Sequence, residues 1–283
     1  MKLLRYGAPG KERPGLLDSK GRIRSLVGVV DDIAGEDLSA ASLDKLRAID
    51  PEKLPVVEDG VRLGPCVARV GKFIGIGLNY SEHAAETGAK VPDEPVMFMK
   101  ATSGISGPND DIVIPRNSKK TDWEVELGVV IGTKAKYVSD ADALQHVAGY
   151  CTVHDLSERE FQLERGGTWD KGKCCDYFGP IGPWLVTQDE VPDPQNLALW
   201  LEVDGHRYQN GNTRTMIFAV KKLVSYLSQF MTLHPGDVIT TGTPSGVGMG
   251  QKPNQIYLRP GQIVRLAVEG LGEQQQRTVA EQL

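Results

Sequence analysis

The sequence predicts a β-rich α+β fold. Short apolar or alternating stretches bounded by Gly, Pro, Asn or Asp recur along the chain, as is typical of strands and turns, and they outnumber stretches with helical spacing. No internal repeat or low-complexity segment appears. A length of 283 residues suits a small domain and a large one, so we expect a small N-terminal α/β domain at 1–65 and the main domain at 66–283.

The composition is that of a soluble globular protein, with 40% hydrophobic and 24% charged residues. A formal net charge of −5 and the lack of a Lys/Arg-rich run argue against nucleic acid as a partner. The first residues lack the apolar run of a signal peptide, and no stretch is long enough to span a bilayer. We therefore expect a cytoplasmic protein with no membrane partner.

The four cysteines are expected to be free thiols. Cys66, Cys151, Cys174 and Cys175 lack the spacing of a zinc site, and a disulfide between the adjacent Cys174 and Cys175 would be strained. A catalytic cysteine is an alternative, but no neighbouring sequence signature supports one.

The first 65 residues alternate strand-like pieces with turns. We expect strands at 2–6, at 13–18 and within 21–30, and a short helix with one apolar side at 42–49. No reactive set of side chains occurs in this region, so function is expected in the main domain.

A strand at 70–77 ends in glycines and leads into a helix candidate. This order is typical of dinucleotide-binding folds, but Tyr80 stands in place of the third glycine of that motif, which excludes it. If Ser81 caps the helix, His83 and Glu86 share one face, where the carboxylate can orient the imidazole as a base. The alternative is an exposed polar helix face on which His83 has no special task.

The remaining elements follow from the same patterns of spacing. We expect strands at 94–100, 112–115, 123–132, 147–155 and 180–186, helices at 141–146, 157–165 and 216–230, a hairpin of 197–203 and 206–209 with turns at 204–205 and 210–211, and a strand that opens into a Gly/Thr/Ser loop within 235–248. The backbone N–H groups and hydroxyls of this last loop suit an anionic ligand.

Two glutamates share one face of the strand at 123–132. Because strand side chains alternate, Glu124 and Glu126 point the same way, and two carboxylates this close repel unless a cation, a shared proton or solvent intervenes. A solvent-facing strand edge would explain the pair without a metal. However, the apolar run at 128–131 indicates burial, which favours a metal.

A third carboxylate, Asp155, ends the strand at 147–155, whereas His154 points to the opposite face and is left out of the site. Three carboxylates form a set of hard oxygen ligands, which suits Mg²⁺, Mn²⁺ or Ca²⁺ better than Zn²⁺. Lys173, in a glycine-rich loop at 166–173, could neutralise a substrate carboxylate or an enolate beside such a metal. The alternative for Lys173 is an ordinary surface lysine.

Several motifs together resemble the fumarylacetoacetate hydrolase family over residues 70–268. They are Gly77-x-Asn79-Tyr80-x-x-His83-x-x-Glu86, Glu94-Pro95 with Phe98-x-Lys100, Glu124-x-Glu126-Leu127-Gly128, His154-Asp155, Gly172-Lys173, and Thr240-Thr241-Gly242-Thr243-Pro244-x-Gly246-Val247-Gly248. The resemblance implies a mixed-sheet β-roll and a homodimer. One departure is Cys174-Cys175, where relatives commonly carry Ser-Phe or a similar pair, and it bears on the shape of the pocket.

The resemblance also implies roles for individual residues. It makes Glu124, Glu126 and Asp155 ligands of Mg²⁺ or Mn²⁺, His83 and Glu86 the pair that activates water, Lys173 the group beside the enolate, and Gln162, Thr243 and Lys100 parts of the substrate pocket.

Residues 162–173 and 178–184 look like the branch of the family that hydrolyses 2,4-diketo-3-deoxy derivatives of L-fuconate or L-rhamnonate. This resemblance implies cleavage of a 2-oxo acid substrate to pyruvate and a second acid such as lactate. Alternatives are ureidoglycolate lyase, a label often given to this branch, and decarboxylation or tautomerisation of a 2-oxo diacid such as oxaloacetate. A metal-dependent binding protein without catalysis is an alternative from another class.

Overall fold

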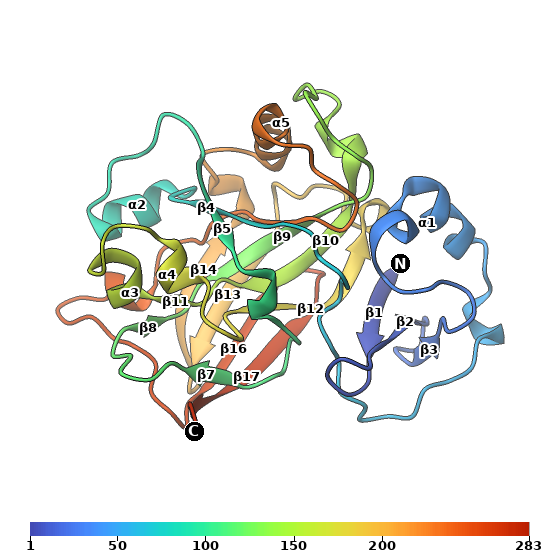
Figure 1. Cartoon of the computed structure of the whole chain (residues 1–283), viewed down its shortest axis with the longest axis horizontal. Helices are drawn as coiled ribbons and strands as arrows, with labels where there is room; N and C mark the ends of the chain where they lie inside the picture. The colour runs from blue at the N-terminus through green and yellow to red at the C-terminus, as the bar shows by residue number, and fades with distance from the viewer. Residues whose placement is uncertain (283) are drawn as a thin grey trace.

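The computed structural model describes residues 1–282, and a mixed sheet of 10 strands forms its centre (Figure 1). The strand order is β3-β2-β1-β12-β10-β9-β15-β4-β5, with β6 beside β12. The pairs β15–β4 and β12–β6 are parallel. The strands of this sheet are β1 (Lys2–Tyr6), β2 (Arg13–Leu17), β3 (Ile23–Ser25), β4 (Phe73–Gly77), β5 (Val96–Lys100), β6 (Ile105–Ser106), β9 (Val125–Ile131), β10 (Val147–His154), β12 (Gly179–Thr187) and β15 (Val238–Thr240).

A second sheet of five strands, in the order β14-β13-β16-β17-β7, shares a hydrophobic core with the first. Its strands are β7 (Ile112–Ile114), β13 (Ala198–Val203), β14 (His206–Asn212), β16 (Ile263–Val268) and β17 (Glu273–Ala280), and a separate pair consists of β8 (Thr121–Asp122) and β11 (Ser157–Glu158). Val125 and Leu127 of β9 enter this core with Leu201 of β13. Because strand side chains alternate, Glu126 must point to the other face of β9.

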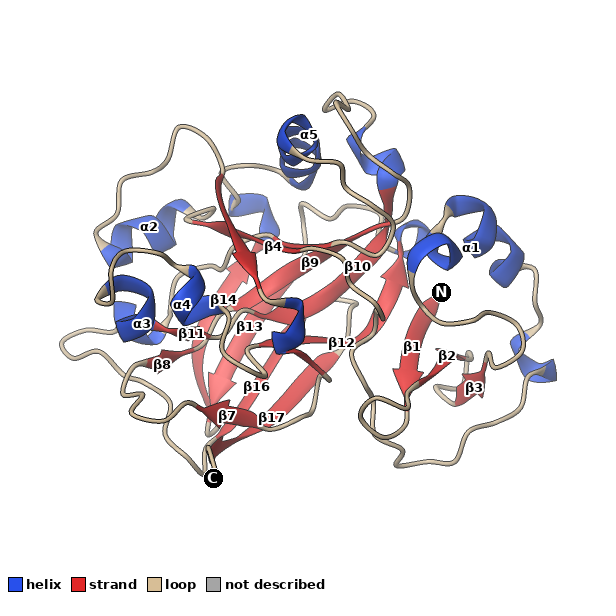
Figure 2. Ribbon diagram, viewed as in Figure 1, coloured by secondary structure: helices blue, strands red, loops and turns tan. Residues whose placement is uncertain are grey.

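The helices are short and lie around the sheets, which confirms the β-rich α+β prediction (Figure 2). They are α1 (Ala40–Arg47), α2 (Ser81–Thr87), α3 (Arg159–Leu163), α4 (Asp170–Lys173) and α5 (Val220–Phe230). On α5, the residues Val220, Leu223, Val224 and Leu227 are buried at the spacing of one helix face. Figure 1 shows α2, α3 and α4 gathered at one end of the molecule. None of the described helices is both long and apolar enough to cross a membrane.

The N-terminal strands continue the central sheet, since β1 pairs with β12 and places Leu3 opposite Leu185. A second core cluster joins Leu38 and Leu43, near the start of the chain, to Val130 and Ala148 of the central sheet. The expected strands at 2–6 and 13–18 are thus confirmed within one residue at each end. The division into domains at residue 65 stays a prediction.

The long helix begins later than expected, at Val220 instead of Met216. Asn79 explains the difference, because its side chain accepts a hydrogen bond from the Phe218 N–H at 2.8 Å and its backbone carbonyl accepts one from the Ile217 N–H at 2.8 Å. These two bonds hold Ile217 and Phe218 outside the helix that begins at Val220. Ile217, expected on the core stripe, therefore lies outside the helix.

Four local predictions differ from the structure, and strand pairing accounts for two of them. The turn expected at 210–211 is part of β14, because Asn210 and Gly211 pair with Trp200 and Leu199 of β13. The helix expected from Ser157 begins at Arg159, because 157–158 pair with β8 as β11. The loop expected at 166–173 ends in the helical turn α4. The helix expected at 141–146 is a 3-10 helix at Ala143–His146.

The C-terminal strands were not predicted. In β17 the buried side chains include Gln274, Gln276 and Thr278, which are polar, so the strand carries little alternation of apolar and polar residues. These residues find hydrogen-bond partners inside the protein. Gln274 Nε2, for example, donates to the carbonyls of Thr152 at 2.9 Å and Gly182 at 3.0 Å.

Gly128 allows β9 and β10 to approach each other closely. It lies opposite Cys151 of β10, and a Cβ atom at this position would lie 2.5 Å from Val153 Cγ2 and 2.8 Å from Cys151 Sγ. Both neighbours are fully buried and have little room to move.

We expect Gly128→Ala to lower the free energy of unfolding by about 1–3 kcal/mol through overpacking. Val153→Ala removes the nearer methyl group, so the double variant should be more stable than the sum of the two single losses predicts. Urea unfolding of the four proteins in this cycle measures the coupling. Strictly additive losses would contradict the proposed contact.

Candidate active site

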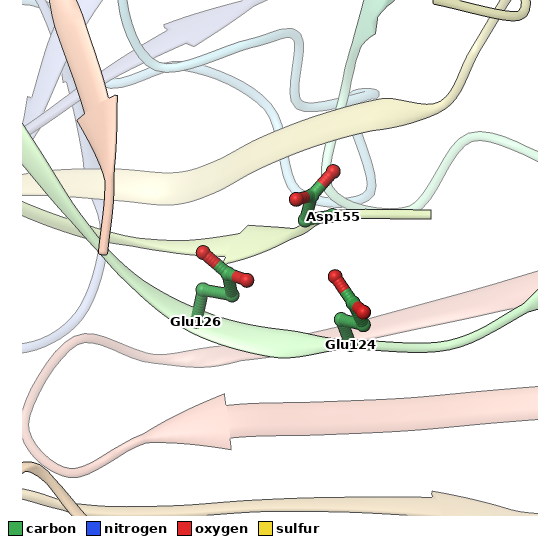
Figure 3. A group of neighbouring side chains, drawn as sticks. All are labelled: Glu124, Glu126 and Asp155. Carbon is green, nitrogen blue, oxygen red and sulfur yellow. The ribbon is translucent and has the colours of Figure 1, made fainter. Parts of the chain in front are cut away.

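Three carboxylates converge where β9 and β10 lie side by side. Glu124 immediately precedes β9, Glu126 lies within it, and Asp155 follows β10, held by a backbone hydrogen bond from its N–H to the Glu124 carbonyl at 2.9 Å. Each residue offers one oxygen within 4.8 Å of the others, and Figure 3 shows the three side chains together. All three are buried, with 4%, 1% and 1% exposure, which excludes the solvent-facing alternative for the glutamate pair.

Two lysines enter the cluster from other elements. Lys173 Nζ, at the end of α4, lies 2.6 Å from Glu124 Oε2 and 2.8 Å from Asp155 Oδ2. Lys100 Nζ, at the end of β5, lies 2.5 Å from Asp155 Oδ1. Burial opposes a charged lysine, but Asp155 and Glu124 raise the pKa of Lys173 above its usual value. Lys173 is therefore cationic and buried, so the surface-lysine alternative is excluded.

Arg159 is a third cation in the site, and the sequence reasoning missed it. Its Nη2 lies 2.6 Å from Glu124 Oε1, its Nε 2.8 Å from Asp122 Oδ2, and its Nη1 donates to Gln162 Oε1 at 3.0 Å. Burial raises the pKa of Glu124, but Lys173 and Arg159 outweigh it and hold that pKa well below its usual range. Two features of the sequence could have pointed to Arg159. Asp122 continues the alternation of Glu124 and Glu126, so a third carboxylate faces the site, and Arg159 lies three residues before Gln162, on the same helix.

Glu126 differs from the other two carboxylates. It accepts hydrogen bonds from the Thr240 hydroxyl and, at 2.7 Å, from the Gly242 N–H, and within residues 1–282 no lysine or arginine forms an ion pair with it. Burial, Asp155 and Glu124 together raise the pKa of Glu126 well above its usual value. In the metal-free protein the surroundings of Glu126 therefore favour its protonated form more than water does.

The donor chemistry fits an oxygen-preferring divalent cation. Three buried carboxylates supply hard oxygen atoms, as Mg²⁺, Mn²⁺ and Ca²⁺ prefer. Glu126, which has no direct ion pair within the described residues, is the position where added positive charge is most favourable. The residues that would hold the ion are thus Glu124, Glu126 and Asp155.

His83 and Glu86 form a hydrogen-bonded pair on α2. His83 Nδ1 lies 2.8 Å from Glu86 Oε1, and Glu86 Oε2 also accepts the Gly246 N–H at 2.9 Å. An ionised carboxylate only accepts hydrogen bonds, so the imidazole proton lies on Nδ1 and Nε2 is free to accept a proton. His83 is 6% exposed, which excludes the exposed-face alternative. The predicted Ser81 cap is wrong, because Tyr80 is the N-cap residue and makes no side-chain capping bond.

A cavity of about 180 Å³ brings most of the predicted residues together. Its lining includes His83, Glu124, Glu126, Asp155, Gln162, Lys173 and Thr243. Two predicted residues lie behind this lining: Glu86 contacts His83, and Lys100 contacts Asp155 and donates to the Lys173 carbonyl at 2.8 Å. We therefore propose that Lys100 acts through Asp155 rather than on the substrate directly.

The cysteines stay outside the site. All four are free thiols, as predicted. Cys174 Sγ accepts a hydrogen bond from the Ala101 N–H at 3.1 Å, and neither Cys174 nor Cys175 is among the described residues that line the cavity. His154 is buried, and its Nδ1 lies 2.7 Å from Gln276 Oε1 on the second sheet. Burial lowers the pKa of His154 to about 4, so it is neutral and part of the packing between the sheets.

The chain is similar to known proteins over most of its length. The family model described as "Fumarylacetoacetate (FAA) hydrolase C-terminal" matches residues 72–279. A protein of Burkholderia multivorans (strain ATCC 17616 / 249), described only as a candidate hydrolase, is 69% identical over 280 residues, which cover 99% of each chain.

Two solved structures are similar over almost the whole chain. A fumarylacetoacetate hydrolase of Exiguobacterium antarcticum is 33% identical with a TM-score of 0.86, and the match covers 99% of this chain and 100% of that one. A 2-hydroxyhepta-2,4-diene-1,7-dioate isomerase of Mycobacterium marinum is 31% identical with a TM-score of 0.75 and full coverage of both chains.

Metal affinity should rise with pH. Because the pKa of Glu126 is raised, a metal must displace a proton from this carboxyl at low pH, and this competition disappears as the pH rises through that pKa. Calorimetric titration with Mg²⁺ or Mn²⁺ in buffers of different ionisation enthalpy should detect the released proton.

Glu126→Gln is the matched control, because it keeps the size of the side chain but removes the titrating proton. This variant should bind the metal more weakly and with a smaller dependence on pH. If the metal affinity of the unmodified protein did not change with pH, the raised pKa of Glu126 would be contradicted.

Proposed function

Because the chain belongs to the fumarylacetoacetate hydrolase family, we propose that it is a metal-dependent hydrolase that cleaves a C–C bond of a 2,4-dioxo acid to pyruvate and a second acid. One observation carries the proposal: the His83–Glu86 pair, the Lys173 ammonium and the buried carboxylates border the same small cavity. A base, a cation and a set of metal ligands are the groups that hydrolysis of a 1,3-dicarbonyl compound needs.

The ligand set supports Mg²⁺ or Mn²⁺ as the cofactor, held by Glu124, Glu126 and Asp155. When bound, such an ion supplies positive charge that polarises the substrate oxygens and favours an enolate. Lys173 adds a fixed positive charge next to two of these carboxylates. On the family resemblance alone, we also propose that the chain forms a homodimer.

His83 takes the first proton in the proposed reaction. Glu86 holds the imidazole with its proton on Nδ1, so Nε2 accepts a proton from water while the water oxygen forms a bond to C4 of the substrate. The C3–C4 bond then breaks, and its electron pair leaves on C3 as the enolate of pyruvate. Lys173 stabilises the negative charge, and the proton held by His83 returns to C3. The products are pyruvate and the carboxylic acid that contains C4.

A 2,4-diketo-3-deoxy sugar acid derived from L-fuconate or L-rhamnonate is the substrate we propose on the motif resemblance. Cleavage of the six-carbon acid would give pyruvate and lactate. The cavity of about 180 Å³ supports a small substrate of this kind. Gln162 and Thr243, which line the cavity, are proposed to contact it.

An isomerase is the second candidate, because a solved structure of that name is 31% identical to this chain. Tautomerisation, or decarboxylation of a 2-oxo diacid such as oxaloacetate, would use the same metal ligands and the same enolate. Neither reaction needs an attacking water molecule. The fate of solvent oxygen therefore distinguishes these candidates from hydrolysis.

We expect His83→Ala to lower kcat for pyruvate release by about 10²–10⁴-fold, because the variant lacks the base that activates water. Metal binding, measured by calorimetry, should be largely kept. His206→Ala is the matched control, since His206 is exposed and outside the cavity, and it should keep full activity. Full turnover of the His83 variant with metal bound would show that the base is misassigned.

Hydrolysis in H₂¹⁸O should place one solvent oxygen in the carboxylate of the second acid, because water attacks C4. Mass spectrometry of that acid after a single turnover measures the label. Pyruvate is not used for this measurement, since its ketone oxygen exchanges with water. Conversion of the substrate without formation of a labelled second acid, to a tautomer or with release of CO₂, would favour the isomerase or decarboxylase candidates.

A further inference from the structure

The side chains that line the cavity form a charged set, here called the charged side, and an apolar set, here called the apolar side. The charged side consists of the three carboxylates with Arg159 and Lys173. The apolar side chains come from five other places in the chain: Ile76, Leu78, Phe98, Leu163, Trp169 and Met249. If the carboxylate and 2-oxo groups of a substrate lie at the charged side, its far end must lie against the apolar side.

Two aromatic rings of this apolar side contact each other. Phe98 of β5 and Trp169, next to α4, meet edge to face with ring centroids 5.6 Å apart. The glycines of β4 make room for them: a Cβ atom on Gly75 would overlap the Phe98 ring, and one on Gly77 would overlap the Trp169 ring. The rings are thus held in place by the backbone of the central sheet.

The two cationic side chains that line the cavity already form ion pairs with carboxylates of the protein. Among the described lining residues, Arg159 is paired with Asp122 and Glu124, and Lys173 with Glu124 and Asp155. Lys173 Nζ lies 5.0 Å from the centroid of the Phe98 ring, where the two sides meet. A second carboxylate at the far end of a substrate would therefore enter the apolar side without a cationic partner, which is costly.

We propose that this chain selects 2,4-dioxo monocarboxylates whose end beyond C4 is short and uncharged, and that Phe98, Trp169 and Leu163 reject substrates with a second, terminal carboxylate. The inference rests on the proposed hydrolase function and adds the substrate class. A hydroxyl group at C5 is compatible with it, because burying an uncharged hydroxyl costs far less than burying a carboxylate. A terminal methyl group fits the aromatic wall.

The test compares two substrates of equal length. We expect kcat/KM for pyruvate release from 2,4-dioxoheptanoate to exceed that from 2,4-dioxoheptanedioate by at least about tenfold, since the two differ only in a terminal methyl or carboxylate. Equal values, or a preference for the dioate, would overturn the selectivity while the hydrolase function stands. If neither compound gave pyruvate with Mg²⁺ or Mn²⁺ present, the hydrolase function would fail and the inference with it.

Leu163→Lys tests the role of the apolar side. Leu163 is 47% exposed at the cavity, so a lysine here should fold and bring a positive charge to the far end of the substrate. We expect the monocarboxylate preference to fall by at least about fivefold, mainly through a lower KM for the dioate. Leu163→Gln, which is polar but uncharged, is the control and should keep the preference. If both variants changed the preference equally, charge at this wall would not determine specificity.

Discussion

The pairing of Lys173 with Glu124 and Asp155 is the interaction on which the site depends. Three carboxylates are buried with single oxygens within 4.8 Å of one another, an arrangement that repulsion would disrupt without cations. Lys173 bridges two of them, while Lys100 and Arg159 each add a further ion pair. The third carboxylate, Glu126, is held by hydrogen bonds, so it is the position at which the cluster could best take up the charge of a metal.

A single loop after β15 joins this cluster to the base. The backbone N–H of Gly242 donates to Glu126 at 2.7 Å, and that of Gly246 donates to Glu86 at 2.9 Å. Gly248 donates in turn to Asp122, the partner of Arg159, at 2.6 Å. The glycine-rich sequence of this loop therefore serves protein carboxylates and fixes the base relative to the carboxylate cluster, while binding of an anionic ligand by the loop stays a prediction.

The strands of the fold were largely readable from the sequence because most carry apolar alternation. The exceptions have clear causes. In β17 the buried positions include Gln274 and Gln276, whose amides are satisfied by distant carbonyls, so hydrophobic spacing carries little signal there. Asn210 and Gly211 are typical turn residues, but pairing with the neighbouring strand β13 holds them extended. The residues around them in the sequence do not indicate this pairing.

The sequence by itself determined which residues are chemically equipped for the site. Alternation along β9 put Glu124 and Glu126 on one face, and three-residue spacing on a helix paired His83 with Glu86, because both periodicities are local properties of the backbone. Only the tertiary structure decided which charges meet. Arg159 and Lys173 reach Glu124 from positions 35 and 49 residues away, and Lys100 lies behind Asp155 and not in the cavity. Such long-range pairings follow from the packing of the sheets and loops. Spacing along the chain determines only which side chains of one helix or strand share a face.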